Sequence, residues 1–180
     1  GKSLTAFWAA QVLNPRTIVV AVPSLALIRQ SLTDWMREFL AHGEKPDWLV
    51  VCSDDSVGNL EHDEFVGEVY DLGVDATTDP SDIAAFLSRR TTKRKIIFTT
   101  YQSGEAFARG VRKARHRLDL GIMDEAHRTV GAQDKSFSYL LFDRNVRIQK
   151  RLFMTATERV VPNADGDTLS TDDPEMYGEC

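Results

Sequence analysis

Short apolar runs alternate along this chain with stretches in which apolar residues recur every three or four positions. The short runs are rich in β-branched and aliphatic residues and are bounded by turn-forming residues, which is typical of buried strands. This pattern predicts strands over 17–22, 48–52, 95–99, 118–123 and 148–155. Helical spacing predicts helices over 4–12, 25–39, 81–87, 102–114 and 137–142, with Ser24 and either Asp79 or Ser81 as N-caps.

Strands that alternate with helices of this length predict an α/β fold, in which a mostly parallel sheet is covered by helices on both faces, giving three layers. The 180 residues are enough for one such domain but too few for two. Residues 53–79 carry acids and glycines with little periodicity, so we expect a long surface excursion there, with one short strand near 65–70. Ligands of parallel sheets bind beyond the carboxyl ends of the strands, so function is expected in the residues that follow each strand.

Composition excludes several classes of protein. The 42% hydrophobic content argues against wholesale disorder, and the two cysteines cannot build a disulfide framework or a cysteine-rich zinc site. No apolar stretch approaches the roughly 18 residues that a membrane span needs, and no secretory signal pattern is visible. We therefore expect a cytoplasmic protein with no membrane partner.

Charge is segregated along the sequence, although the net charge of −5 gives no overall support to nucleic-acid binding. No Lys or Arg occurs between residues 46 and 88. Residues 89–117, by contrast, contain ten basic residues and only one acidic residue, Glu105. The basic block is either a solvated face or a patch that meets phosphates. Part of the run from Arg109 to Arg117, on the helix that follows Gln102, is expected to frame a nucleic-acid track together with Gln102.

The chain opens with Gly1-Lys2-Ser3 at the start of a predicted helix. Helix N–H groups and the helix dipole attract phosphate, a lysine neutralises its charge, and a hydroxyl can ligate Mg²⁺. The tripeptide alone is common by chance, and the full phosphate-binding pattern also needs a glycine five residues before Gly1.

The second candidate is Asp124-Glu125-Ala126-His127, which follows the predicted strand 118–123. An acid that leaves a buried strand can hold Mg²⁺, and an adjacent glutamate can activate water for attack on a phosphate. An acid pair that caps the next helix is the alternative for Asp-Glu by itself. The four residues together, in one chain with a Gly-Lys-Ser helix start, favour the nucleotide site.

With these motifs the sequence resembles the first RecA-like domain of a DEAH-type superfamily 2 helicase or translocase. Gly1-Lys2-Ser3 matches the end of motif I, residues 124–127 match motif II, and Thr155-Ala156-Thr157 match motif III. Residues 22–30 are similar to motif Ia and residues 99–103 to the motif Ib region. The amino-acid sequence around motifs Ia and II is most similar to that of restriction-enzyme-type helicases, the type III or type I-like Res subunits.

The resemblance implies a role for each matched position. Gly1, Lys2 and Ser3 would bind the ATP phosphates, Ser3 and Asp124 would hold Mg²⁺, and Asp124 and Glu125 would be catalytic. Coupling between ATP and nucleic acid would fall to His127, Thr155, Ala156 and Thr157. Capping of a strand end is the alternative role for the two threonine hydroxyls. Backbone contacts to nucleic acid would come from Pro23, Ser24, Thr100, Tyr101 and Gln102. Tyr101 would either stack on a base or pack in the core.

The resemblance further implies a motor that couples ATP hydrolysis to movement on DNA or to its unwinding, in a bacterial restriction or phage-defence system. An RNA helicase and a non-catalytic binding module with an ATPase fold are the alternatives. Partners would be DNA, with RNA still open, a second RecA-like domain, and nuclease or methyltransferase modules.

Relative to the family pattern, the first strand and the second RecA-like domain are missing, so we expect a fragment of a larger protein. The ATP-binding domain would span 1–161, and 162–180 would lead towards the second domain. The isolated chain is expected to bind ATP poorly and to be inactive.

Overall fold

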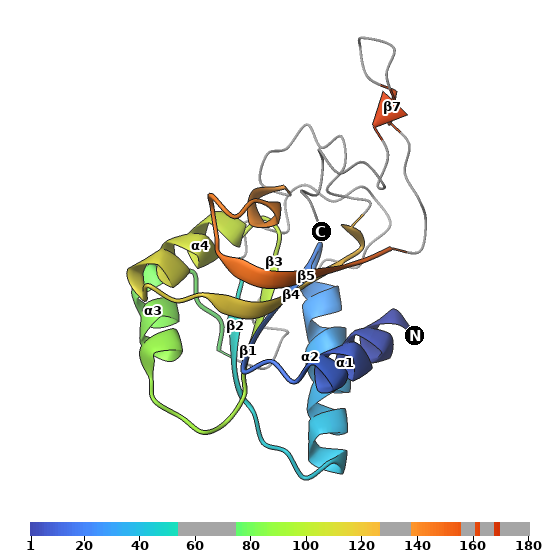
Figure 1. Ribbon diagram of the computed structural model, residues 1–180, viewed down its shortest axis with the longest axis vertical. Helices are drawn as coiled ribbons and strands as arrows, with labels where there is room; N and C mark the ends of the chain where they lie inside the picture. Colours follow the sequence, from blue (N-terminus) through green and yellow to red (C-terminus); the bar gives the residue numbers. More distant parts are fainter. Residues whose placement is uncertain (54–74, 127–137, 156–160, 163–167, 170–180) are drawn as a thin grey trace.

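Five parallel strands form the central layer of the fold (Figure 1). The computed structural model describes residues 1–53, 75–126, 138–155, 161–162 and 168–169. The strands lie in the order β2-β3-β1-β4-β5, and every pairing within this sheet is parallel. Their bounds are β1 (Thr17–Val22), β2 (Asp47–Val51), β3 (Lys95–Thr100), β4 (Leu118–Asp124) and β5 (Ile148–Met154). A separate antiparallel pair joins β6 (Val161–Pro162) to β7 (Thr168–Leu169).

Helices cover both faces of the sheet. Figure 1 shows α1 (Lys2–Leu13) and α2 (Leu25–Ala41) on one side, with α3 (Pro80–Ser88) and α4 (Gly104–Lys113) on the other. A one-turn 3₁₀ helix, η4 (Tyr139–Leu141), packs beside α4. The three-layer α/β architecture predicted from the sequence is therefore confirmed.

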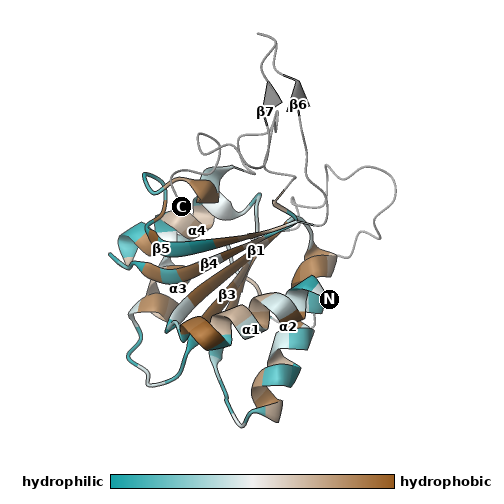
Figure 2. Cartoon of the chain, turned by 45° about the vertical axis from the view of Figure 1, so that its right-hand side comes forward, coloured by the Kyte–Doolittle hydropathy of each residue, from teal (hydrophilic) through white to brown (hydrophobic). Residues whose placement is uncertain are grey.

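The strand side chains alternate between two apolar cores, as the pleat of a strand requires. Ile18, Val20 and Val22 of β1 join the core under α1 and α2, whereas Val19 and Ala21 join the core under α3 and α4. Figure 2 shows the result, with the mainly hydrophobic strands β1, β3 and β4 at the centre and the largely hydrophilic β5 at the edge of the sheet. Because β1 is buried on both faces, it reads in the sequence as one continuous apolar run.

Local hydrogen bonds fix where the helices begin and end. The Ser24 hydroxyl accepts a hydrogen bond from the Leu27 N–H at 3.4 Å and caps α2, as predicted. Asp79 caps α3 in the same way, since its carboxylate accepts from the Ser81 N–H at 2.6 Å. This hydrogen bond is the main reason that the pKa of Asp79 lies below its ordinary value. Both caps therefore mark where their helices begin.

The predicted elements agree with the observed ones to within about two residues, with one exception. The helix predicted over 137–142 is only the 3₁₀ turn η4, because the backbone becomes extended again at Phe142. The strand predicted near 65–70 lies outside the described residues, as does most of the excursion over 53–79. No helix in the described part of the chain is long and apolar enough to cross a membrane.

Candidate functional site

Lys2 and Glu125 come from opposite ends of the sequence and meet in space. Lys2 is the first residue of α1, and Glu125 directly follows β4. The Nζ atom of Lys2 forms an ion pair with Oε1 of Glu125, and both side chains are partly buried. The start of α1 therefore lies at the carboxyl edge of the sheet, beside the end of β4.

The turn after β4 has an unusual backbone. Glu125 has φ = 53°, in the left-handed region that residues other than glycine seldom adopt. The preceding Asp124 is almost fully buried, and its Oδ1 accepts a hydrogen bond from the Glu125 N–H at 2.9 Å. Such backbone geometry is concentrated at functional sites, where the surroundings hold it in place. Here it turns the Glu125 side chain towards Lys2.

Ser3 supplies a buried polar atom without a protein partner. Its Oγ is shielded from solvent and has no hydrogen-bond partner within the described residues. The first turn of α1 also carries no acidic residue, so the helix dipole there is not offset by its own helix. An unsatisfied buried hydroxyl is costly unless a ligand engages it. Ser3 is therefore suited to ligating a cation or accepting a bond from a bound molecule.

A hydroxyl and a single carboxylate fit Mg²⁺ at a phosphate site. Magnesium is usually held there by one or two protein oxygens, with waters and substrate phosphates completing its shell. The candidate ligands are Ser3 Oγ and the carboxylate of Asp124, whose Oδ1 also accepts the hydrogen bond from Glu125. Within the described residues, no three His, Cys, Asp or Glu side chains gather as a metal site made by protein alone would require.

Tyr101 connects three strand ends to one another. Its N–H donates to the carbonyl of Val22 at 3.1 Å, and its hydroxyl donates to the carbonyl of Asp124 at 2.8 Å. The side chain is 0% exposed. Of the two alternatives for Tyr101, the structure shows packing in the core, because the ring is fully buried. Nothing in the sequence indicated the bond from its hydroxyl to Asp124.

The other residues predicted to contact nucleic acid lie together at the neighbouring ends of β1 and β3. The Gln102 side-chain amide donates to the Pro23 carbonyl at 3.5 Å. The two hydroxyls of this group are engaged within the protein, since Ser24 caps α2 and Thr100 donates to Ser103 Oγ at 3.1 Å. The side-chain oxygen of Gln102 is buried without a partner among the described residues. The cluster is assembled, but its hydroxyls serve local structure.

The predicted coupling residues are only partly visible. Thr155 follows β5 and is exposed, and the pairing of Met154 with Asp124 places it beside the turn at Glu125. His127, Ala156 and Thr157 lie outside the described residues.

The basic run does not border this edge of the sheet. Arg112 lies in the last turn of α4, and Arg115 and Arg117 lie between that helix and the start of β4. They are thus at the amino ends of the strands, whereas Gln102 is at the carboxyl ends. Arg109, in the middle of α4, forms an exposed ion pair with Glu105 at 2.6 Å. The prediction that this run continues the track from Gln102 is wrong.

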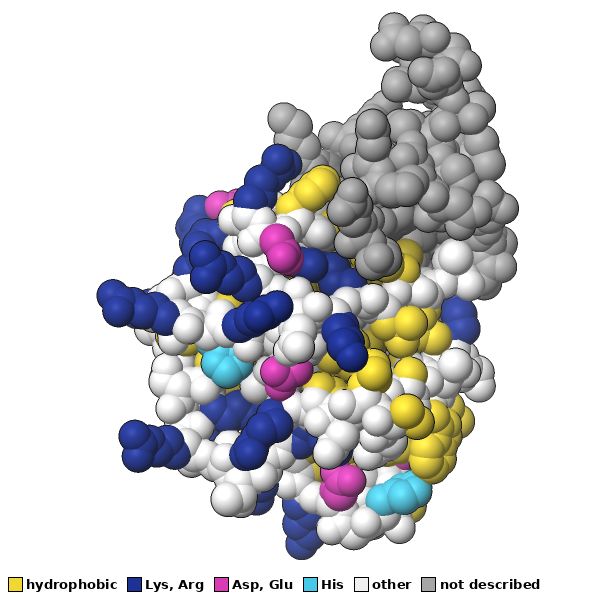
Figure 3. All heavy atoms as spheres, viewed as in Figure 1, with side chains coloured by type: hydrophobic (Ala, Val, Ile, Leu, Met, Phe, Trp, Pro, Cys, Tyr) yellow, Lys and Arg dark blue, Asp and Glu magenta, His cyan; other side chains and the backbone are white. Residues whose placement is uncertain are grey.

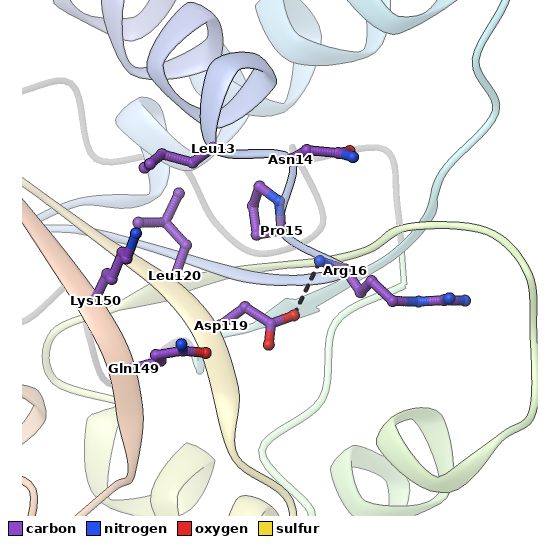
Figure 4. Close-up of a pocket in the computed structure, with 8 residues that line it drawn as sticks. All are labelled: Leu13, Asn14, Pro15, Arg16, Asp119, Leu120, Gln149 and Lys150. Atoms are coloured by element: carbon purple, nitrogen blue, oxygen red, sulfur yellow. Dashed lines mark hydrogen bonds between the residues drawn. The ribbon is translucent and has the colours of Figure 1, made fainter.

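A pocket of about 260 Å³ also lies at the amino ends of the strands (Figure 4). Figure 4 shows Asp119 at its centre, with its carboxylate towards the backbone N–H of Arg16 at 2.9 Å. The same oxygen accepts from the N–H of Thr17 at 2.9 Å and from its hydroxyl at 3.0 Å. Asp119 therefore ties β4 to the start of β1, and its hydrogen bonds explain it without a ligand.

A parallel sheet with a Lys-Ser helix start facing an Asp-Glu turn defines the RecA-like domain of a superfamily 2 helicase. The family model described as "Type III restriction enzyme, res subunit" matches residues 1–159, and the chain belongs to this family. A search of curated proteins finds no match.

Two solved structures share the fold at a similar level of identity. One is a nuclease-deletion mutant of the Type ISP restriction-modification enzyme LlaGI in complex with a DNA substrate mimic, with 28% identity and a TM-score of 0.74. The other is the ATP-dependent Type ISP restriction-modification enzyme LlaBIII bound to DNA, with 27% identity and a TM-score of 0.77. Each similarity covers 99% of this chain but only 14% and 13% of those chains. The chain thus corresponds to about one seventh of either enzyme.

Proposed function

We propose that this chain is the ATP-binding motor domain of a DNA helicase or translocase that acts in a restriction system. It would couple ATP hydrolysis to movement along DNA or to unwinding. The observation that carries the proposal is the meeting of Lys2 and Glu125 beside the buried Asp124. Family membership and the two DNA-bound, similar structures support the choice of substrate.

The nucleotide phosphates would bind at the start of α1. Lys2 supplies a positive charge, and the first-turn N–H groups of the helix supply hydrogen-bond donors. Ser3 Oγ and Asp124 would hold Mg²⁺, which, when bound, neutralises part of the phosphate charge. Phosphoryl transfer is catalysed mainly by positioning and charge stabilisation, and these groups would supply part of both.

Glu125 would orient the attacking water and take its proton. In the structure its carboxylate is occupied by Lys2, so it is held in an ion pair. When Lys2 turns to the phosphates, that ion pair is lost and the Glu125 carboxylate becomes available to water. The pair thus gives a simple reason why activation of water would follow nucleotide binding.

The same edge of the sheet would connect the nucleotide to DNA. Tyr101 joins the backbone of Asp124 to that of Val22, at the end of the strand that leads into Pro23. Gln102, on the same turn as Tyr101, reaches the Pro23 carbonyl. A shift of either turn on DNA binding would therefore move the main chain that carries Asp124.

The proposed domain spans residues 1–161, with residues 162–180 leading towards a second RecA-like domain. In this family of motors, by the resemblance described above, the second domain closes the nucleotide cleft. Nuclease or methyltransferase modules would be further partners of the whole enzyme.

The test is the Glu125→Gln variant of the enzyme that carries this domain. Loss of a general base lowers turnover by about 10² to 10⁴, so DNA-stimulated ATP hydrolysis should fall by at least about 100-fold. ATP affinity should change by less than about threefold, because Lys2 and Ser3 are retained. Glu105→Gln is the matched control, since Glu105 is an exposed acid on α4 that pairs only locally with Arg109.

Near-normal turnover in Glu125→Gln would remove the assignment of the water-activating group. If duplex DNA, single-stranded DNA and RNA all fail to stimulate ATP hydrolysis, the proposal that the domain is a motor is contradicted. Stimulation by RNA alone would replace the DNA substrate with RNA.

A further inference from the structure

A pocket rich in arginine lies away from the candidate nucleotide site. It has a volume of about 480 Å³ and is formed by the end of α4, the segment before β4 and the loop before β5. We call it the arginine pocket; its lining includes Arg112, Arg115, His116, Arg117, Arg144 and Arg147. The strands of the sheet separate it from the turn at Glu125, by about 20 Å for a strand of seven residues. It is therefore a separate site.

The pocket carries a strong local excess of positive charge in a chain whose net charge is −5. Its five arginines are accompanied by one acid, Asp143, which is paired with Arg151 at 2.7 Å. Figure 3 shows Lys and Arg side chains gathered on this α4 side of the molecule. Like charges brought this close are unfavourable unless an anion offsets them.

Two of the arginines have structural roles. Arg112 donates from Nη1 to the carbonyl of Asn145 at 2.9 Å, and this bond ties α4 to the loop before β5. The guanidinium of Arg144 lies over the ring of Phe142, 4.5 Å from its centroid. These contacts hold the walls of the pocket in place.

The other three arginines are available to a ligand. Arg115, Arg117 and Arg147 are exposed, and none of them forms an ion pair or a side-chain hydrogen bond with the described residues. By contrast, Arg109 and Arg151 each have an acidic partner. Unpaired guanidinium groups around a hollow are what a bound anion would use.

His116 adds a buried polar atom to the same pocket. Its Nε2 is shielded from solvent and has no hydrogen-bond partner within the described part of the chain. Val111 forms an apolar wall beside it. The pocket is therefore lined by cationic groups, and one of its lining residues has an unsatisfied polar atom buried beneath the surface.

The lining favours phosphate as the ligand chemistry. All of its cationic residues are arginines, whose planar forks bind phosphate through two parallel hydrogen bonds. We infer that the arginine pocket binds the phosphate backbone of DNA, as a second DNA contact on the opposite side of the domain from the nucleotide. The choice of DNA over an acidic protein segment rests on the proposed function.

The test uses fluorescence anisotropy with a labelled 20-base-pair duplex and the enzyme that carries this domain. The triple variant Arg115→Gln, Arg117→Gln, Arg147→Gln removes three exposed charges from the pocket. The matched control Arg37→Gln, Lys45→Gln, Arg90→Gln removes three exposed charges elsewhere. Because all six side chains are exposed, neither variant disturbs the core.

Each phosphate contact contributes about 0.9 to the slope of log affinity against log salt concentration. The pocket variant should therefore bind the duplex at least about tenfold more weakly at low salt, with a slope shallower by about 2 to 3. The control should change affinity by less than about threefold.

Equal weakening in both variants would overturn the inference, because non-specific attraction would then explain the binding. Unchanged binding in the pocket variant would also overturn it and would point to an acidic protein partner. The proposed function is tested separately by Glu125→Gln, which leaves the pocket intact. If Glu125→Gln loses turnover as predicted but the pocket variant binds the duplex normally, only the inference about the arginine pocket is rejected.

Discussion

Replacing Tyr101 with phenylalanine removes one hydroxyl group from the centre of the candidate site. That hydroxyl donates to the backbone carbonyl of Asp124 at 2.8 Å. The ring itself is fully buried in the core under α3 and α4, and phenylalanine keeps it. The variant therefore isolates one hydrogen bond and leaves the packing of the core almost unchanged.

The magnitude follows from the burial of this bond. A neutral intramolecular hydrogen bond contributes about 1 kcal/mol of net stability, so the free energy of unfolding should fall by about that amount. If the same energy positions Asp124, the Mg²⁺ concentration for half-maximal ATP hydrolysis should rise by up to about fivefold, since 1.36 kcal/mol corresponds to a factor of ten.

Two measurements check this prediction: urea unfolding and the Mg²⁺ dependence of ATP hydrolysis. The urea midpoint should fall by about 0.5 M, given a typical dependence of about 2 kcal/mol per molar. Tyr139→Phe is the matched control, because no hydrogen bond is found for the Tyr139 hydroxyl among the described residues. That control should leave both quantities unchanged.

A Tyr101→Phe variant with normal stability and normal Mg²⁺ dependence would refute the positioning role. Base stacking predicts a different pattern, because phenylalanine stacks as well as tyrosine and ATP hydrolysis would keep its Mg²⁺ dependence.

Two further predictions concern stability. In Gly110→Ala the new Cβ would lie 2.5 Å from Cβ of Ile83. This overpacking costs about 1–3 kcal/mol of stability, which exceeds the roughly 1 kcal/mol by which alanine stabilises a helix relative to glycine. Thermal unfolding should therefore shift to lower temperature, and an unchanged or higher midpoint would contradict the close packing of α3 on α4. The pKa of His116 lies below its ordinary value of 6.5. Burial is the main cause, the positive charge of Lys95 adds to it, and the negative charge of Asp119 opposes it. The folded state then binds fewer protons than the unfolded state, so His116 stabilises the fold above pH 6.5 and less so as the pH falls below that value. The stability difference between the wild type and His116→Gln should shrink from pH 7.5 to pH 5.5 in urea titrations; a difference independent of pH would reject this.

The strands could be predicted well from the sequence because buried strands appear as short runs of β-branched and aliphatic residues. The run Thr17–Val22 consists of β-branched and aliphatic residues and lies just after Pro15 and before Pro23, so few other structures accommodate it. The same logic failed for 137–142. There Leu140 and Leu141 are buried by packing against the rest of the domain, and one 3₁₀ turn is enough to bury them.

Contacts between distant segments were harder to predict. Lys2 and Glu125 were matched through known motifs, but the hydroxyl of Tyr101 reaches Asp124 only because β1 lies between β3 and β4. The arginine pocket has a similar origin. Parallel pairing of Leu118 with Ile148 brings together two basic segments that are about 30 residues apart in the sequence.

The measurement that tests the central claim most directly is a structure of the enzyme with Mg²⁺ and a non-hydrolysable ATP analogue. Lys2 Nζ should then lie within about 3 Å of a phosphate oxygen, and Glu125 should have left its ion pair with Lys2. Ser3 Oγ and Asp124 should lie on the metal, directly or through water. Phosphates bound elsewhere, with the pair between Lys2 and Glu125 intact, would contradict the account.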